Sequence, residues 1–300
     1  MMFCSLLALL VLGAAREVAG QRRTDNKGGA SLQDINLALR EDRFADVVEL
    51  TTMVLREKLP PKLAAQLHCA RARGYQGLHA LDRAFTDLNE AIGLDDSLKV
   101  AREWRASFEE DSGKWREAAA DRTAAIGEGH TAPADYFARG QDYKMTGEKE
   151  KARGDYEKVA AAPADDAPDY SHRAQARAAL GEGAQAAMDF AAAKRMAPSD
   201  PEILNDAAWF EATSPSAKVR DGRAAVRDAT LACERSHWED ADNVDTLAAA
   251  WAEAGDFSRA LSYEKQALAL AKVAAGRKVL EQHLGNFEKG KPVRESSPLQ

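Results

Sequence analysis

The chain has 300 residues, a net charge of −7, and 45% apolar, 30% charged and 7% aromatic side chains. Alanine supplies about a fifth of the residues, while the β-branched and aromatic residues that fill sheets are sparse, so we expect an all-helical protein. The acidic balance argues against nucleic acid as a partner, and three cysteines without a CxxC pair exclude a disulfide scaffold.

The N-terminus contains an apolar run of 13 residues, 3–15, and Val18-Ala19-Gly20 offers a cleavage site after the intervening Arg16 and Glu17. Such a run is short for a membrane span, which needs about 20 residues, but it suits the core of a signal peptide. We predict that residues 1–20 are a signal peptide, or alternatively an uncleaved anchor that tethers the chain to a membrane. Residues 21–30 are polar and are predicted to be a linker. The chain would then be exported, to a periplasm or the outside, or anchored at the cell envelope.

Four blocks of 34 residues follow one another without a gap, at 65–98, 99–132, 133–166 and 167–200. Their positions 8, 20 and 27 hold small residues, with one valine: Ala72, Ala106, Gly140 and Ala174; Ala84, Ala118, Ala152 and Ala186; Ala91, Ala125, Val159 and Ala193. Two helices can pack this closely only where small side chains face each other. Position 15 is glycine in three blocks, where a positive φ would end the first helix. Each block is therefore predicted to be a helical hairpin, which must stack on others to bury its apolar face.

This pattern resembles the tetratricopeptide repeat family, whose hallmark is small residues at positions 8, 20 and 27 of a 34-residue unit. Residues 241–274 match in the same way, and 201–240 match with an insertion between the two helices. Residues 28–61 fit poorly, because Ile35 and Val47 stand where small residues belong. We interpret them as a degenerate N-terminal capping repeat.

The resemblance implies a right-handed α-solenoid of six to seven stacked helix-turn-helix hairpins over residues 31–288, in the manner of bacterial multi-repeat proteins. Residues 276–288 are predicted to be a C-terminal capping helix, and residues 289–300 a disordered tail. Since the repeats leave no room for a catalytic domain, we expect no enzyme activity, no cofactor and no metal.

One feature departs from the plain family pattern: position 7 is arginine and position 23 is aspartate in all four blocks. The pairs are Arg71 with Asp87, Arg105 with Asp121, Arg139 with Asp155, and Arg173 with Asp189. We predict a structural ladder of ion pairs that ties helix to helix, because each arginine arrives with its own carboxylate. The alternative is a row of anion-binding arginines.

The resemblance implies that the first helices line a concave groove for a partner, at positions 2, 5, 9, 12 and 13. The candidate groove residues are Gln66, Arg73, Glu103, Phe137, Gln141, Lys144, Asn205 and Trp209. Phe137 and Trp209 would be aromatic anchors; the alternative is that both pack against the adjacent repeat. The Lys and Asn pairs by which some family members clamp the acidic C-termini of chaperones are absent.

The resemblance therefore implies a non-catalytic scaffold that binds a peptide or a partner protein. An accessory subunit of an envelope assembly or secretion complex is the main alternative. A helical-repeat RNA-binding protein is a further one, which the acidic charge disfavours.

Other motifs are weaker. Residues 181–186 read GxGxxA but follow a helix rather than a strand, so an inter-helix turn explains them. Asp240, Asp242 and Asp245 have calcium-loop spacing without the loop's glycine and glutamate, which favours helix N-capping. The six histidines form no HExxH motif, and Cys69 and Cys233 are predicted to be packed thiols.

Overall fold

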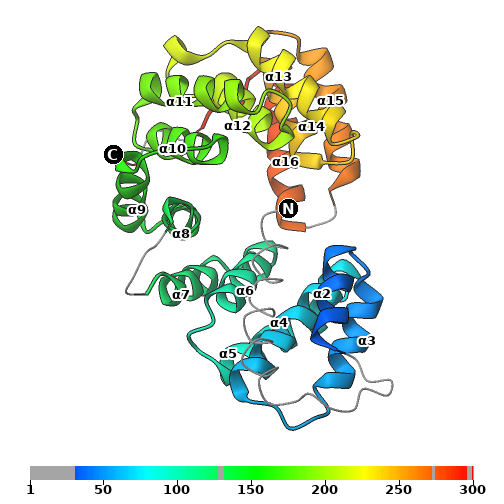
Figure 1. Ribbon diagram of the computed structural model, residues 1–300. Helices are drawn as coiled ribbons and strands as arrows, with labels where there is room; N and C mark the ends of the chain where they lie inside the picture. The colour runs from blue at the N-terminus through cyan, green and yellow to red at the C-terminus, as the bar shows by residue number, and fades with distance from the viewer. Residues whose placement is uncertain (1–30, 128–131, 272–273, 296–298, 300) are drawn as a thin grey trace. The chain divides into compact units, whose positions relative to one another are not determined.

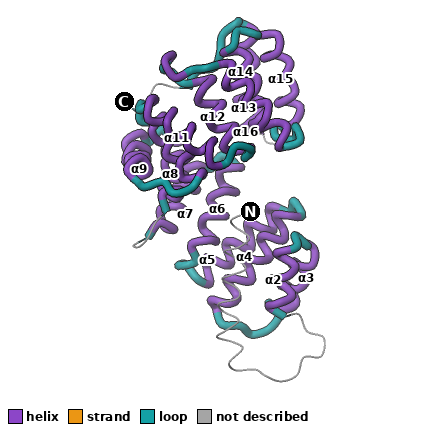
Figure 2. Tube along the Cα trace, turned by 45° about the horizontal axis from the view of Figure 1, so that its top comes forward, coloured by secondary structure: helices purple, strands orange, loops and turns teal. Residues whose placement is uncertain are grey.

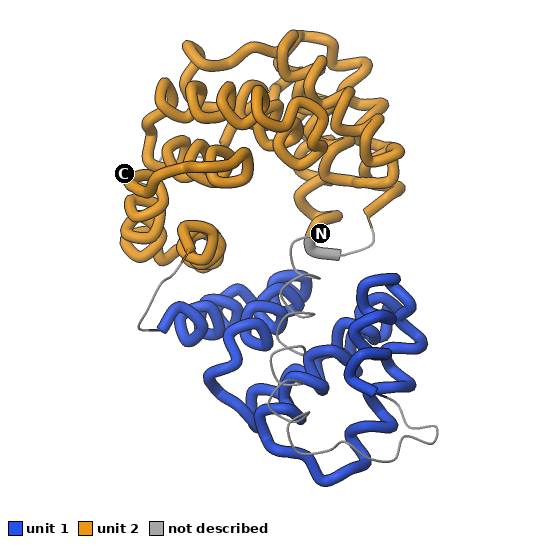
Figure 3. The backbone as a smooth tube through the Cα atoms, in the orientation of Figure 1, with its two compact units in different colours: residues 1–128 blue, residues 129–300 orange. Residues whose placement is uncertain are grey.

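The computed structural model describes residues 31–127, 132–271, 274–295 and 299 (Figure 1). These residues form fifteen α-helices and one 3₁₀ turn and contain no strand, which confirms the predicted all-helical class. They divide into two compact units, residues 1–128 and 129–300 (Figure 3). The predicted signal peptide or anchor and the linker lie outside the described residues. Among the described helices, none is both long and apolar enough to cross a membrane.

Unit 1 contains three helical hairpins, each made of two consecutive helices. They are α2 (Leu32–Arg40) with α3 (Phe44–Val54), α4 (Pro61–Gly77) with α5 (Leu81–Leu94), and α6 (Lys99–Asp111) with α7 (Trp115–Ile126). The first hairpin is the repeat predicted to be degenerate. Its Ile35 and Val47 are fully buried, so larger side chains fill the place that alanines fill elsewhere.

Unit 2 contains four hairpins and a final helix (Figure 2). The hairpins are α8 (Pro133–Thr146) with α9 (Lys149–Ala161), α10 (Ala167–Ala179) with α11 (Gly183–Met196), α12 (Pro201–Thr213) with α13 (Gly222–Arg235), and α14 (Ala241–Glu253) with α15 (Phe257–Leu270). The insertion between α12 and α13 contains the 3₁₀ turn Ala217–Val219. Helix α16 (Ala274–Glu288) packs on the last hairpin, at the position predicted for the capping helix. The first helices α8, α10, α12 and α14 line the inner side of this unit (Figure 1).

The small residues of the repeat lie where the two helices of a hairpin cross. Ala84, Ala152 and Ala186 at position 20 have no exposed surface. At Gly140 a Cβ atom would lie 2.9 Å from the ring of Tyr156, so this crossing has room only for glycine. The repeat period therefore reflects direct helix–helix packing. The handedness of the solenoid and its continuity between the two units stay predictions.

The C-terminal segment differs from the predicted disordered tail. Val293 is 7% exposed and belongs to the apolar core of the last two hairpins, and Glu295 and Leu299 form backbone hydrogen bonds to α12 and α10. The apolar residues of this segment do not recur at helical spacing. Its backbone N–H groups nevertheless donate hydrogen bonds to carbonyl groups at the ends of helices, which have no partner within the helix. The absence of a helical period in the sequence excluded a helix here, but it did not exclude a non-helical segment that packs against the helices.

Candidate interaction face

In four hairpins the arginine of position 7 and the aspartate of position 23 contact each other at two points, in the pairing that their spacing predicts. Arg139 Nε donates to Asp155 Oδ2 at 2.7 Å and its Nη2 to Oδ1 at 2.8 Å. The same geometry joins Arg71 to Asp87, Arg105 to Asp121, and Arg173 to Asp189. All four aspartates are buried. Burial alone would raise the pKa of Asp87, but hydrogen bonds from Arg71 and His68 outweigh it and lower that pKa.

The remaining guanidinium nitrogen often reaches the preceding hairpin. Arg71 Nη1 donates to Thr52 Oγ1 at 3.3 Å, and Arg105 Nη1 donates to Asn89 Oδ1 at 2.7 Å. Arg173 Nη1 donates to a backbone carbonyl at the end of α9 at 3.1 Å. Each of these arginines therefore ties three helices together. Because the N–H groups of these arginines donate to groups inside the protein, the arrangement favours a structural ladder of ion pairs over a row of anion-binding sites.

The hairpin of α12 and α13 has lost the arginine but keeps the aspartate, Asp228. Lys194 from the preceding hairpin supplies a cation, with Nζ 2.7 Å from Asp228 Oδ2 and 2.7 Å from Glu211 Oε1, and the exposed Arg227 donates to the other oxygen of Asp228 at 2.8 Å. The side chain of Lys194 is 20% exposed. The sequence gives no local signal for this pairing, because Lys194 and Asp228 lie one full repeat apart.

The candidate groove residues of unit 1 are engaged with their own unit. Arg73 lies over the ring of Phe44 with its guanidinium carbon 5.0 Å from the centroid, and Glu103 pairs with Lys99 at 3.2 Å. Gln66 is half-buried, and its Oε1 has no hydrogen-bond partner among the described residues. These contacts do not bring the three residues into one site.

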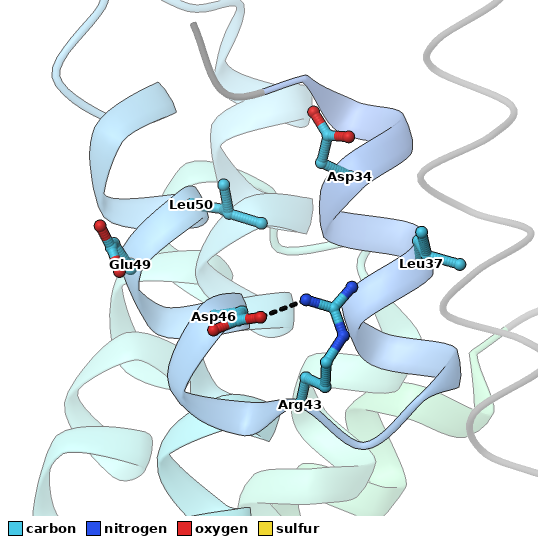
Figure 4. A pocket seen from close by; sticks show the side chains of 6 residues that line it. All are labelled: Asp34, Leu37, Arg43, Asp46, Glu49 and Leu50. Atoms are coloured by element: carbon cyan, nitrogen blue, oxygen red, sulfur yellow. Dashed lines mark hydrogen bonds and ion pairs between the residues drawn. The ribbon is translucent and has the colours of Figure 1, made fainter. Parts of the chain in front are cut away.

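A shallow hollow of about 300 Å³ lies between α2 and α3 (Figure 4). Its lining is Asp34, Leu37, Arg43, Asp46, Glu49 and Leu50. Arg43 pairs with Asp46 and with Glu41, and Asp34 caps α2 through Ser31. Three of its charged groups thus already have partners, and the hollow contains none of the candidate groove residues.

In unit 2 the two predicted anchors both contact other parts of the chain. The ring of Phe137 stacks on that of His172 in the next hairpin, with centroids 4.9 Å apart, as the alternative interpretation expected. Trp209 lies 5.7 Å from the ring of His283 on α16. Gln141 Oε1 accepts a hydrogen bond from the hydroxyl of Tyr156 at 2.9 Å. Phe137 therefore packs between two hairpins, whereas Trp209 also forms a hydrogen bond through its indole N–H.

That polar contact is with the C-terminal segment. Trp209 Nε1 donates to Glu295 Oε1 at 2.8 Å, and Lys144 Nζ lies 3.5 Å from Glu295 Oε2. The backbone N–H of Glu295 donates to the carbonyl of Thr213 at 2.9 Å, and that of Leu299 to the carbonyl of Ala179 at 3.1 Å. The described residues that follow α16, red in Figure 1, thus contact the C-terminal ends of α12 and α10. Glu295 thus brings together two candidate groove residues that come from different hairpins.

Polar side chains on the adjoining part of α10 and α12 were not predicted as a group. Asp206 Oδ2 accepts from Ser171 Oγ and Gln175 Nε2, each at 2.8 Å. Burial raises the pKa of Asp206 to about 7. His172 Nδ1 and Asn205 Oδ1 are buried without a hydrogen-bond partner among the described residues. We call the side of α8, α10 and α12 that carries Lys144, His172, Asn205 and Trp209 the inner face.

A second buried polar cluster joins α14, α15 and α16. His283 Nδ1 lies 2.9 Å from Asp245 Oδ1, and one ligand-type atom from each of Asp245, Glu264 and His283 lies within 4.8 Å of the others. Burial and the neighbouring Asp245 carboxylate hold the pKa of Glu264 well above its usual range. Asp240 Oδ1 caps α14 by accepting from two backbone N–H groups, as predicted from the sequence.

Cys69 and Cys233 are free, fully buried thiols. Burial raises the pKa of each to about 12, so neither is a reactive thiolate at neutral pH. This confirms that they are packed thiols.

No family model matches the sequence, and no curated protein matches it significantly. Among solved structures, the fold is similar to a chain of the APC/C hetero-tetramer Cut9–Hcn1, with a TM-score of 0.63 and 14% identity. That match covers 95% of this chain and 52% of the other, so this chain spans about half its length. It is also similar to a tetratricopeptide repeat protein from Parabacteroides merdae, with a TM-score of 0.60, 13% identity, and 86% and 97% of the two chains covered. The chain therefore has the fold of tetratricopeptide repeat proteins.

Proposed function

We propose that the chain is a non-catalytic protein-interaction scaffold, and that the inner face of unit 2 binds an extended segment of a partner protein. The observation that carries this proposal is the position of Glu295. A segment of the chain itself lies on the inner face and is held there by side-chain and backbone hydrogen bonds. The surface is therefore chemically suited to an extended peptide.

The bound segment indicates which peptide chemistry the face accepts. Thr213 and Ala179 are the last residues of α12 and α10, and carbonyls in the last turn of a helix have no partner within that helix. They accept N–H groups from any extended backbone, so they contribute affinity without specificity. The indole of Trp209 and the ammonium of Lys144 select a carboxylate. An apolar residue two positions earlier is buried, as Val293 is. The preferred ligand is an extended segment with an apolar residue followed by an acidic one.

Two polar atoms of the inner face lack a hydrogen-bond partner among the described residues. They are His172 Nδ1 and Asn205 Oδ1, and both are buried. A buried polar atom without a hydrogen bond costs about 1–3 kcal/mol, which a ligand that satisfies it regains. A partner that replaces the C-terminal segment and also bonds to these atoms would bind more strongly than the segment does.

An accessory subunit of a larger assembly is a second form of the same proposal. It is supported by the similarity of the fold to a chain of a hetero-tetramer. Placement of that assembly at the cell envelope depends on residues 1–20, which lie outside the described residues. An RNA-binding role is disfavoured by the net charge of −7.

Affinity capture from the native source tests the proposal. The wild-type chain would be compared with Asn205→Ala, Trp209→Phe and a control variant, Met188→Ala, whose side chain is 73% exposed on α11. We expect a protein that is captured by the wild type and the control, resists nuclease, and is reduced at least severalfold by the two inner-face variants. Capture that depends on RNA, or that the two variants leave unchanged, contradicts the proposal.

A further inference from the structure

The last hairpin and helix α16 share a buried cluster of one imidazole and two carboxylates. Asp245 comes from α14, Glu264 from α15 and His283 from α16. Their ligand-type atoms all lie within 4.8 Å of one another. Three separate helices therefore aim one polar group each at a common point.

Glu264 is the unusual member of this cluster. Its side chain has no exposed surface, and neither carboxylate oxygen has a hydrogen-bond donor among the described residues. The polar group it faces is the carboxylate of Asp245, which is itself 8% exposed. Two adjacent buried carboxylates repel each other and lose hydration, so one of them must hold a proton or both must share a cation.

The arrangement fits a shared cation. Ligand-type atoms of the three residues lie within 4.8 Å of one another, and ligands that bind one ion side by side at about 2.1 Å lie about 3–3.4 Å apart. His283 Nδ1 and Asp245 Oδ1, 2.9 Å apart, form a hydrogen bond that an ion between them would replace with little movement. An imidazole with two carboxylates suits Zn²⁺, Mn²⁺ or Fe²⁺ better than Ca²⁺ or Mg²⁺, which prefer oxygen ligands alone.

We propose that Asp245, Glu264 and His283 bind one divalent transition-metal ion, Zn²⁺ or Mn²⁺, that fastens helix α16 to the last hairpin. The ion neutralises the two buried carboxylates and gives Glu264 the partner it lacks. It acts as a structural clip, because its ligands come from the hairpin on one side and from the terminal helix on the other. The C-terminal segment that follows α16 is thereby held at a fixed starting point.

The chain contains a matched control for this site. His68 Nδ1 lies 2.8 Å from Asp87 Oδ1, which repeats the His283–Asp245 contact. The cation beside that pair is Arg71, whose guanidinium bonds to both oxygens of Asp87. A His–Asp pair already neutralised by arginine has no charge left for a metal ion, so His68→Gln should leave metal binding unchanged.

The test uses the full-length chain without an affinity tag, stripped with a chelator and titrated with Zn²⁺ and Mn²⁺ by calorimetry, with the bound metal counted by mass spectrometry. We expect one ion per chain, a melting temperature that rises by several degrees with the ion, and affinity reduced at least tenfold in Glu264→Gln and His283→Gln. Circular dichroism of the metal-free variants checks that both fold. Glu264→Gln should be at least as stable as the metal-free wild type, since it places a neutral amide of the same size beside Asp245 in place of a buried acid that has no hydrogen-bond partner among the described residues. The absence of a stoichiometric ion in the wild type, or unchanged binding in both folded variants, overturns the proposal and leaves a shared proton as the resolution.

Discussion

The pair of Arg139 and Asp155 offers the sharpest test of the arginine–aspartate ladder. Their side chains are 12% and 4% exposed, and two hydrogen bonds of 2.7 and 2.8 Å join them. Replacing either residue by alanine leaves a buried charge without its partner, which typically costs about 3–5 kcal/mol of unfolding free energy. Replacing both removes the two charges together. We therefore expect the double variant to lose about 2–3 kcal/mol less than the sum of the two single variants.

Arg139 and Asp155 also contact other side chains, and these contacts determine which control variants are needed. Arg139 also lies over the rings of Tyr136 and Tyr143, so part of the loss in Arg139→Ala comes from packing, and the double-mutant cycle cancels that part. Lys158 Nζ also contacts Asp155, at 3.3 Å, but its side chain is 52% exposed. Lys158→Ala should therefore cost only about 0–1 kcal/mol.

Urea unfolding followed by circular dichroism at 222 nm measures these free energies by linear extrapolation. The slopes of the transitions must agree among the variants, because repeat proteins can lose two-state behaviour. A coupling energy below about 0.5 kcal/mol would show that the two residues stabilise the hairpin independently. That result would refute the claim that their ion pair holds the two helices together.

Three further predictions concern other parts of the chain. Lys194→Met should lose about 1–3 kcal/mol of unfolding free energy, because it leaves Glu211 without a cation and Asp228 with only the exposed Arg227, while the exposed neighbour Arg195→Met should change it by less than about 0.5 kcal/mol in urea melts. Gly140→Ala should cost about 1–3 kcal/mol through overpacking against a tyrosine ring, whereas Gly154→Ala on α9, with nothing within 4 Å, should stabilise by up to about 1 kcal/mol. The raised pKa of Asp206, about 7 in the folded chain, means that the folded state holds a proton that the unfolded state has released between pH 4 and 7. The stability of the wild type relative to Asp206→Asn should therefore be greatest below pH 4 and fall as the pH rises to 7, and a difference independent of pH would contradict this assignment.

The hairpins could be predicted from the sequence because their packing repeats every 34 residues. A small residue at a helix crossing, such as Ala152, recurs at the same place in each block and so is visible in one sequence. The arginine–aspartate pairs are visible for the same reason, since both members lie in one hairpin at a fixed spacing of 16 residues.

Contacts that occur once could not be predicted in this way. Lys194 pairs with carboxylates of the next hairpin. Glu295 accepts a hydrogen bond from the indole of Trp209, 86 positions away in the sequence. Asp245 and His283 lie 38 positions apart on helices that only the fold brings together. The position of Phe137 in the repeat likewise left open whether its ring meets a partner or the next hairpin, and its stacking on His172 was visible only in three dimensions.

Peptide binding to the inner face tests the central claim most directly. A fluorescent peptide with the sequence of residues 289–295 would be titrated by anisotropy into full-length chains. A chain whose own segment is weakened by Arg294→Ala and Glu295→Ala should bind the peptide at least tenfold more tightly than the wild type, whose face is occupied. Adding Trp209→Phe to that chain keeps an aromatic ring beside His283 but removes the N–H donor, and should weaken binding severalfold. Equal affinity in the wild type and both variants would contradict the account, because the inner face would then not be a peptide-binding surface.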